Sequence, residues 1–524
     1  MFRFSAPAFR AKSRGVGANS TRARRPRSFV RRARLDDLPH FPESGASDSV
    51  AFEAPASADL APFSSLVPAI IGACLMMQTL SATVIVNALP TMARSLHEDP
   101  VRLNTAITVY LLAAGIVLPI SGWAADRFGA RKIFVFAIVA YALSNAVCGF
   151  AQNLAELLMA RMAEGAAGAM LLPVGRLVLL RATPKHNLVQ AMSVLTMPAL
   201  LGPVLGPPIG GAIITYASWR WIFFLNLPIA AGGVALVLKF IPHVKGEEPR
   251  PLDWTGLALT GLGMAGVVYG FENLGRPGIP VWVQATMMIG GGACLAAFVR
   301  HSGRTRHPIV DLSLLKIQTF RASVVGGAFM RVGMGATPFL LALLLQVAFG
   351  LTALQAGLMT FASAAAAIVM KTAAPPILRR FGFKRTLSVN AVVVALTFMA
   401  YALFTPATPH WLIYVVLLSG GFFRSLQFTS LNGMAFADLD QPRMSRASTL
   451  STMGQQLSLS IGIGLAAMLL RLFRGSGPLS AAAIAPAFVV VGAITLISLL
   501  FFVTLPRNAG SELNGGPSRR AVGR

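Results

Sequence analysis

Long apolar stretches follow one another from Leu66 to Val503, separated by short polar segments. An apolar helix of roughly 20 residues is long enough to cross the ~30 Å hydrocarbon layer of a membrane. Of the 524 residues, 55% are hydrophobic and 12% are charged, whereas about 25% are charged in an average soluble domain. The sequence therefore predicts an all-α integral membrane protein and leaves no room for a large soluble domain.

The apolar stretches predict fourteen membrane spans. We expect them near residues 65–89, 103–124, 133–151, 154–180, 189–215, 221–241, 254–273, 281–299, 321–347, 354–376, 386–405, 410–436, 447–470 and 483–504. Most cations outside the N-terminal segment lie in the loops after even-numbered spans, and such loops stay in the cytoplasm. Both termini are then expected in the cytoplasm. The excess of arginine over lysine fits a GC-rich genome and therefore favours a bacterial inner membrane.

The net charge of +26 has a local origin. Residues 1–35 contain ten arginines and one lysine, with no acid before Asp36. The segment 1–62 is predicted to be a basic, disordered tail. It could lie on anionic lipid, be a transit peptide, or reflect a start codon assigned too far upstream. Because the other cations are spread over alternate loops, we expect no nucleic-acid partner.

A charged loop follows the second expected span. Its sequence from Ser121 is SGWAADRFGARK, and FGFKR returns at 381–385, so the core F-G-x-[RK]-[RK] recurs 253 residues later. A repeat at this distance suggests two related halves. The loop resembles the signature loop of the major facilitator superfamily, which implies a cytoplasmic gate formed by Gly122, Asp126, Arg127, Gly129, Arg131 and Lys132.

The fifth expected span carries two Gly-Pro pairs and a Gly-Gly pair, GPVLGPPIGG from residue 202. Glycine permits close helix packing, and proline bends a helix. The run is similar to the antiporter motif of the same superfamily, on Gly202, Pro203, Gly206, Pro207, Gly210 and Gly211. The segment WRWIFFLNLP that begins at Trp219 also resembles the superfamily, at its entry to span 6.

These motifs together resemble the fourteen-span drug:proton antiporter branch, over about residues 65–505. The resemblance implies a six-helix bundle at 63–245, two inserted spans and a loop at 246–316, a second six-helix bundle at 317–506, and a C-terminal tail at 507–524. It also implies alternating access by rocking of the two bundles.

The fourth span contains Arg161 and Glu164, in a sequence close to the superfamily's R-x-x-Q-G. A charge in mid-span is costly without a partner, and three-residue spacing places both side chains on one helix face. The glutamine of the motif is a glutamate here, whereas Ser81 replaces the aspartate that the resemblance implies in span 1. Glu164, tuned by Arg161, is the candidate for proton coupling. The alternative is a static ion pair that only fixes the helix packing.

Polar residues at other positions of the spans are candidates for a substrate cavity. They are Gln78, Ser81, Arg331, Arg424, Gln427, Asn432 and Gln455. Three functions remain open: proton-coupled efflux of drugs or other small amphipathic compounds, export of organic anions or metabolites bound by the arginines, and a non-transporting membrane sensor. We expect no enzyme activity, no cofactor and no metal. The partners expected are a small-molecule substrate, protons and the lipid bilayer, for a monomer with or without an efflux adaptor.

Overall fold

The computed structural model describes residues 66–182, 188–241, 251–274, 279–305, 308–439, 441–474, 477, 479–506 and 509–510. The regular elements of this part of the chain are all helical. The α-helices are α1 (Leu66–Ser95), α2 (Thr105–Phe128), α3 (Ala130–Phe150), α4 (Leu154–Ala182), α5 (Leu188–Tyr216), α6 (Trp221–Phe224), α7 (Asn226–Phe240), α8 (Trp254–Glu272), α9 (Val281–Ser302), α10 (Gln318–Arg321), α11 (Gly327–Leu343), α12 (Ala353–Ala400), α13 (His410–Phe436), α14 (Gln441–Arg474) and α15 (Ala481–Val503). The tail expected at 1–62 and most of the one expected at 507–524 lie outside the described residues.

Twelve helical stretches of the described chain are long and apolar enough to cross a membrane. One of them, Ala353–Leu403, has 51 residues, more than twice the length that one crossing needs. Helix α5, with 29 residues, stands outside that set of twelve. The all-helical membrane fold is therefore confirmed, and the count of fourteen spans stays a prediction.

The two copies of the F-G-x-[RK]-[RK] motif have the same backbone conformation. Gly129 separates α2 from α3 with φ 93°, and Gly382 interrupts α12 with φ 72°. Side chains other than glycine rarely adopt such positive φ values. The sequence predicted longer loops, at 125–132 and 377–385. That prediction is wrong, because the basic residues on both sides of each glycine are helical and a single residue makes each break.

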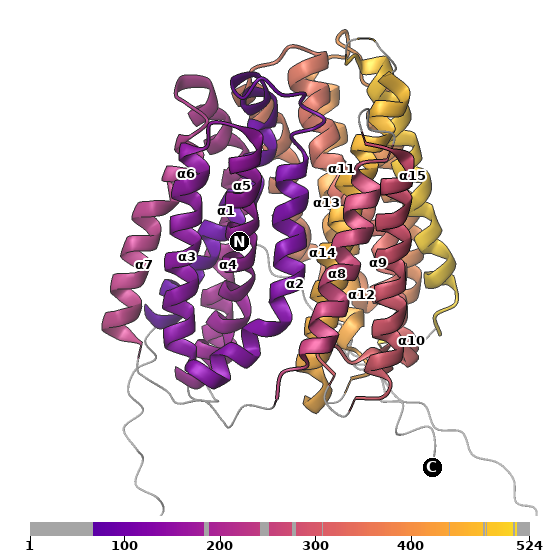
Figure 1. Cartoon of the computed structure of the whole chain (residues 1–524). Helices are drawn as coiled ribbons and strands as arrows, with labels where there is room; N and C mark the ends of the chain where they lie inside the picture. Colours follow the sequence, from indigo (N-terminus) through magenta and orange to yellow (C-terminus); the bar gives the residue numbers. More distant parts are fainter. Residues whose placement is uncertain are drawn as a thin grey trace, which may run out of the picture. The chain divides into compact units, whose positions relative to one another are not determined.

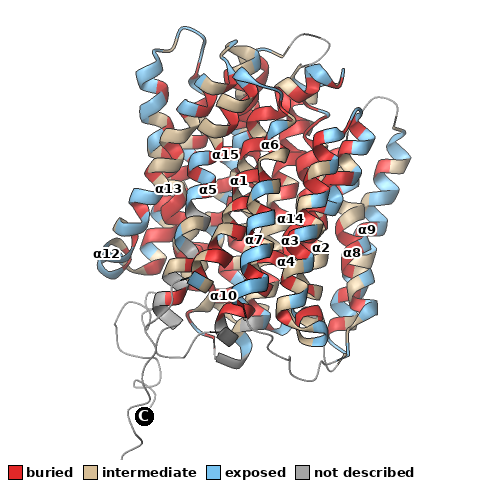
Figure 2. Cartoon of the chain, turned by 90° about the vertical axis from the view of Figure 1, so that its left-hand side faces the viewer, coloured by how far each residue is buried: buried red, intermediate tan, exposed pale blue. Residues whose placement is uncertain are grey.

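The helices form two groups. In the N-terminal lobe, α1–α7, α1 packs on α5 and α4 packs on both α2 and α3; in the C-terminal lobe, α10–α15, α12 packs on α13, and α11 packs on α14 and α15. Contacts between α5 and α12 and between α2 and α14 join the lobes, and the pair α8–α9 lies against α14 and α2. Figure 1 shows the lobes side by side, and Figure 2 shows exposed residues on the outward faces of α7 and α9.

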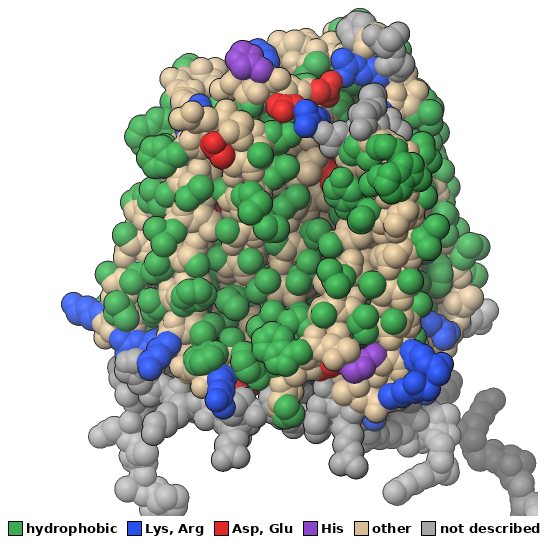
Figure 3. Space-filling view, in the orientation of Figure 1, with side chains coloured by type: hydrophobic (Ala, Val, Ile, Leu, Met, Phe, Trp, Pro, Cys, Tyr) green, Lys and Arg blue, Asp and Glu red, His purple; other side chains and the backbone are tan. Residues whose placement is uncertain are grey.

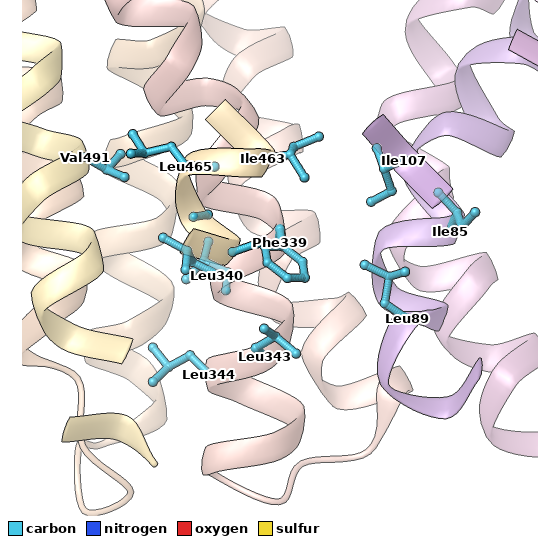
Figure 4. Close-up of a cluster of buried hydrophobic side chains, with 14 of the residues drawn as sticks. Ile85, Leu89, Ile107, Phe339, Leu340, Leu343, Leu344, Ile463, Leu465 and Val491 are labelled. Atoms are coloured by element: carbon cyan, nitrogen blue, oxygen red, sulfur yellow. The ribbon is translucent and has the colours of Figure 1, made fainter. Parts of the chain in front are cut away.

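One apolar cluster extends across both lobes. It includes Ile85, Leu89 and Ile107 from the N-terminal lobe, and Phe339 and Ile463 from the C-terminal lobe. Figure 4 shows these side chains on the two sides of the interface. A second cluster, with Ile71 and Phe134 among its members, belongs to the N-terminal lobe alone. The lobes therefore share a core near one end of the bundle.

Candidate functional site

Arg161 and Glu164 form a fully buried ion pair on α4. Arg161 Nη1 lies 2.6 Å from Glu164 Oε2, and both residues are 0% exposed. The three-residue spacing that favours contact on a helix face is therefore realised as a direct bond. The desolvation of two charges is offset only by close geometry and further hydrogen bonds, so the remaining partners of both groups matter.

The Glu164 carboxylate is held from three helices. Ser81 Oγ of α1 donates to Glu164 Oε1 at 2.9 Å, and Cys148 Sγ of α3 lies 3.6 Å from Glu164 Oε2. Together with Arg161 of α4, these donors suit the ionised form of the carboxylate, because hydrogen bonds to a charged acceptor are the stronger ones. The sequence had assigned Ser81 to the substrate cavity; in the structure its hydroxyl contacts the buried acid.

The Arg161 guanidinium is positioned by α2. Its Nε donates to Ala106 O at 3.2 Å, and its Cζ lies 4.3 Å from the centroid of the Tyr110 ring, in cation–π contact. Gly165 makes this approach possible, because a Cβ there would overlap the carbonyl oxygen of Tyr110. Among the described residues, Arg161 Nη2 has no hydrogen-bond partner.

The C-terminal lobe repeats this arrangement without the acid. Arg424 and Gln427 of α13 have the same spacing as Arg161 and Glu164; Arg424 Nη2 donates to Ser363 Oγ at 3.0 Å, and Asn390 Nδ2 donates to Gln427 Oε1 at 2.8 Å. Ser363 lies before the break at Gly382 in α12, and Asn390 lies after it. In the N-terminal lobe Arg161 bonds α2 and Glu164 bonds α3. In the C-terminal lobe Arg424 bonds the part of α12 before Gly382, and Gln427 bonds the part after it.

Arg331 of α11 is a buried cation with one described bond. It is 1% exposed, and its Nη1 donates to Ser323 O at 3.0 Å. Ser323 lies in a π-helical turn, Ala322–Gly326, that directly precedes α11. Within the described part of the chain, Arg331 Nε and Nη2 have no hydrogen-bond partner. The guanidinium is therefore enclosed, and two of its nitrogen atoms have no partner among the described residues.

The other residues predicted for the cavity have different surroundings. Gln427 is 0% exposed, and its Nε2 donates to Leu387 O at 3.2 Å. Both the oxygen and the nitrogen of its amide thus bond residues of α12. Gln78 lies near Gly168, beside Tyr110 and Tyr141. Asn432, Gln455 and Arg424 are half-buried. The structure thus brings Gln78 and Ser81 to the Glu164 region and leaves the C-terminal residues in a separate region.

The glycines of the α5 motif face two different helices. A Cβ on Gly202, Gly206 or Gly210 would collide with α1. A Cβ on Gly211 would instead meet the backbone of Ala353 and Leu354, at the start of α12 in the other lobe. Pro207 O accepts a bond from Asn87 Nδ2 of α1 at 3.4 Å, whereas Pro203 is exposed. The motif therefore serves close packing of α5 on α1 and of one lobe on the other.

The residues predicted to form a gate surround the α2–α3 break. Arg131 donates to Leu238 O at the end of α7 and so ties α3 to α7. Gly122, Arg127 and Lys132 are exposed, and Asp126 is half-buried.

Polar bonds join the lobes at the opposite end of the bundle. Arg474 Nη1 at the end of α14 lies 2.6 Å from Asp99 Oδ2 in the segment between α1 and α2. Nearby, Asn104 Nδ2 donates to Ile463 O at 3.3 Å, and Gln346 Nε2 donates to Asn87 O at 3.0 Å. Sequence reasoning missed these pairs, because no local spacing connects residues hundreds of positions apart.

Comparison with known proteins agrees with this architecture. Residues 71–463 and 324–522 match the Major Facilitator Superfamily. A putative multidrug resistance protein MdtD from Salmonella heidelberg (strain SL476) is 35% identical over 400 residues, which are 76% of this chain and 84% of that protein. The MdtD protein from Cronobacter sakazakii (strain ATCC BAA-894) is 34% identical over 397 residues, with the same coverage.

Solved structures share the fold at low sequence identity. A bacterial homolog of the human lysosomal transporter Spinster, in an inward-facing and unoccupied conformation, aligns with a TM-score of 0.60 and 15% identity over 87% of this chain and 98% of that one. The xylose transporter XylE from E. coli, in an inward open conformation, aligns with a TM-score of 0.56 and 13% identity over 86% and 98%.

The fold is a two-lobed helical membrane bundle with a buried ion pair in one lobe, and the matched family and relatives identify a transporter rather than an enzyme. The chain belongs to the Major Facilitator Superfamily and is a secondary active transporter.

Proposed function

We propose that this transporter exports drugs and other small amphipathic compounds in exchange for protons. The names of the MdtD relatives support drug export. Glu164 supports the proton step, since a buried carboxylate can take up and release one proton as its surroundings change. This carboxylate, held from α1, α3 and α4, is the observation that carries the proposal.

The proposed orientation places both termini in the cytoplasm of a bacterium, with the protein in the inner membrane. Figure 3 shows a wide hydrophobic band with Lys and Arg gathered along the lower rim, which supports assigning that rim to the cytoplasm. Acids and bases are both present at the upper rim. We take the working unit to be a single chain, with no adaptor needed for exchange across this membrane.

The proposed cycle is alternating access. The pairs Asp99–Arg474, Asn104–Ile463 and Asn87–Gln346 hold the lobes together at the end assigned to the outside. The cycle requires these bonds to break, while Asp126 and the basic residues around Gly129 close the cytoplasmic end as a latch. Gln78, Ser81, Asn432 and Gln455, with Arg331, Arg424 and Gln427, are proposed to line or shape the substrate path.

In the proposed proton step, Glu164 alternates between the ionised and the protonated carboxyl. The ionised carboxylate accepts from Arg161, Ser81 and Cys148. A proton on the carboxyl removes its charge, so the attraction to Arg161 falls and the ion pair no longer fastens the site. Arg161 keeps its contacts with Ala106 and Tyr110 in either case, and is therefore suited to tune the acid.

The test is dye-driven proton movement in everted membrane vesicles from a strain that lacks other pumps. Ethidium is expected to release protons from vesicles that contain the wild-type protein and to leave the gradient intact with Glu164→Gln. Glu156→Gln is the matched control, because Glu156 lies on the same helix but bonds Gln152 and Asn153 at its exposed start. Undiminished coupling in Glu164→Gln would remove this carboxyl from the proposal.

The same strain separates the other functions. Drug efflux predicts that the gene confers resistance to cationic dyes. Resistance or export confined to anionic compounds such as fluorescein would replace the proposed cargo with organic anions. Absence of substrate-dependent proton flux for both compound classes would favour a non-transporting sensor.

A further inference from the structure

The hydroxyl of Ser81 behaves differently from its neighbours on α1. Thr79 Oγ1 donates to Leu75 O and Met76 O, and Thr83 Oγ1 donates to Thr79 O and Leu80 O, so both can satisfy themselves on their own helix. Ser81 instead donates across to Glu164 Oε1 on α4, 83 residues away in the chain. Ser81 is 5% exposed, so water gives this bond little competition.

We propose that Ser81 is a positioning residue that ties the charge state of Glu164 to helix α1, the helix that also holds the C-terminal lobe. The proposal rests on the proposed function, in which Glu164 carries the transported proton. It adds a role that the acid and its arginine do not supply, namely a connection from the proton site to a moving element.

The groups that face Glu164 show why a hydroxyl from α1 matters. Arg161 faces it from α4, Tyr110 from α2, and Tyr141 and Cys148 from α3. Arg161 is the charged group among them, and the tyrosines and the thiol are neutral at ordinary pH. The contribution of α1 is a neutral hydroxyl, which can donate to a carboxylate and accept from a protonated carboxyl. Ser81 can therefore stay bonded through the proton cycle while the sense of the bond reverses.

Helix α1 connects this bond to the interface between the lobes. The glycines Gly202, Gly206 and Gly210 pack α5 tightly against the α1 turns around Ser81. Six residues further on, Asn87 O accepts from Gln346 of the C-terminal lobe at 3.0 Å. When the bond between Glu164 and Ser81 becomes stronger or weaker, the attachment of α1 to α4 changes with it. Because α1 also contacts the other lobe, this change acts on the interface between the lobes.

The consequence for pH has a definite sign. A donor to a charged acceptor stabilises the ionised form more than the neutral form, so Ser81→Ala favours the protonated carboxyl. The midpoint of the pH profile of exchange is then expected to move up by about one pH unit. Ser81→Thr keeps the hydroxyl and should restore the wild-type midpoint.

The experiment measures ethidium–proton exchange against pH in proteoliposomes of the full-length protein. Ser419→Ala is the control, because this half-buried serine of α13 bonds its own helix at Val415 O. It should leave the midpoint unchanged. If Ser81→Ala fails to fold, Ser81→Cys keeps a weaker donor and should shift the midpoint in the same direction by less.

The positioning role of Ser81 and the proposed proton site at Glu164 can be contradicted separately. A Ser81→Ala protein with a slower rate but the wild-type midpoint would overturn the positioning role. If Glu164→Gln also loses coupling, the assignment of Glu164 as the proton site would still stand. Full coupling in Glu164→Gln would instead overturn the proposed function on which the inference rests.

Discussion

Glu164 and Arg161 place opposite charges where water is excluded, and either charge alone would be costly there. The effective penalty for burying an ion is several kcal/mol, and removal of one member of a buried pair typically costs about 3–5 kcal/mol. The 2.6 Å contact between them, with further donors from Ser81 and Cys148, offsets that penalty. The same pairing makes the site sensitive to protonation, because one proton on the Glu164 carboxyl removes its negative charge and leaves the charge of Arg161 unpaired.

A residue-scale prediction concerns the two glycines with positive φ. Gly129→Ala and Gly382→Ala should each destabilise the protein by about 1–2 kcal/mol, because an L side chain is strained in that backbone conformation. Thermal unfolding in detergent measures the loss. Gly122→Ala is the matched control, since Gly122 is helical, exposed and has open space around it. Equal unfolding temperatures for all three variants would contradict the strain.

Single residues also show what sequence could and could not supply. The pairing of Arg161 with Glu164 follows from a three-residue spacing on one helix, so it was predictable. The bond from Ser81 depends on the register of α1 against α4, which no local pattern encodes. Gln427 was predicted to line a cavity, which stays a prediction, and its amide bonds Asn390 and Leu387. Polarity in a span indicates a partner, but it does not identify which one.

At the scale of elements, one carboxylate links the inserted helices α8 and α9 at one end of the pair. Asp253 caps α8 by accepting from Gly256 N at 2.8 Å, lies 2.8 Å from His301 Nε2 at the end of α9, and accepts from Ile309 N at 3.3 Å. Partial burial raises the pKa of the Asp253 carboxyl, but these bonds outweigh it and hold the pKa below its ordinary value.

Asp253→Ala should therefore lower the thermal unfolding midpoint by a few degrees, since loss of a cap costs about 0.5–2 kcal/mol. Asp253→Asn keeps the capping oxygen and should lose less. Because the folded pKa is depressed, the carboxylate stabilises the fold fully above its unfolded value near 3.9 and loses this effect as pH falls through the folded value. The deficit of Asp253→Asn should thus be present at neutral pH and disappear only in strong acid. A deficit that persists well below the ordinary pKa of an aspartate would contradict this account.

Some helix boundaries have local causes that the sequence shows, and others depend on tertiary contacts that it does not show. The starts of α12 and α15 follow from capping residues, Thr352 with Gln355 and Ser480. The apolar periods of the spans were visible in the sequence, but the helical turns around Gly129 and Gly382 were not, because cationic stretches read as loops. The π-helical turn that brings Ser323 O to Arg331 was likewise not predictable from a sequence pattern.

At the scale of the whole molecule, the lobes meet at Gly211 of the α5 motif and also through polar pairs that no repeat or motif encodes. The repeat predicted two related halves, and the matching conformations of Gly129 and Gly382 agree with that relation. Which ends of the halves touch in this state is set by distant pairs such as Asp99–Arg474. An alternating transporter needs such contacts to be weak enough to break in every cycle.

Arg474→Gln is expected to favour opening of this end. The pair is partly exposed, and such pairs contribute about 0.2–1 kcal/mol, which corresponds to an increase of up to about fivefold in the open population. Spin labels at Ser95→Cys and Leu472→Cys would report the distance between the lobes, in a background without Cys74, Cys148 and Cys294. Arg102→Gln is the control, because Arg102 pairs with Glu98 within one segment of the N-terminal lobe. Identical distance distributions in Arg474→Gln and Arg102→Gln would show that the Asp99–Arg474 pair does not hold this end closed.

The central claim is that one carboxyl group, Glu164, carries the transported proton. Infrared difference spectra of the purified protein in lipid, recorded as pH is lowered, measure carboxyl protonation without any need for a substrate. Other carboxyl groups of the chain also protonate in acid, so the account predicts one component of the protonated-carboxyl band that grows in the wild type and in Glu156→Gln and is missing in Glu164→Gln. The same band at the same pH in Glu164→Gln would contradict it.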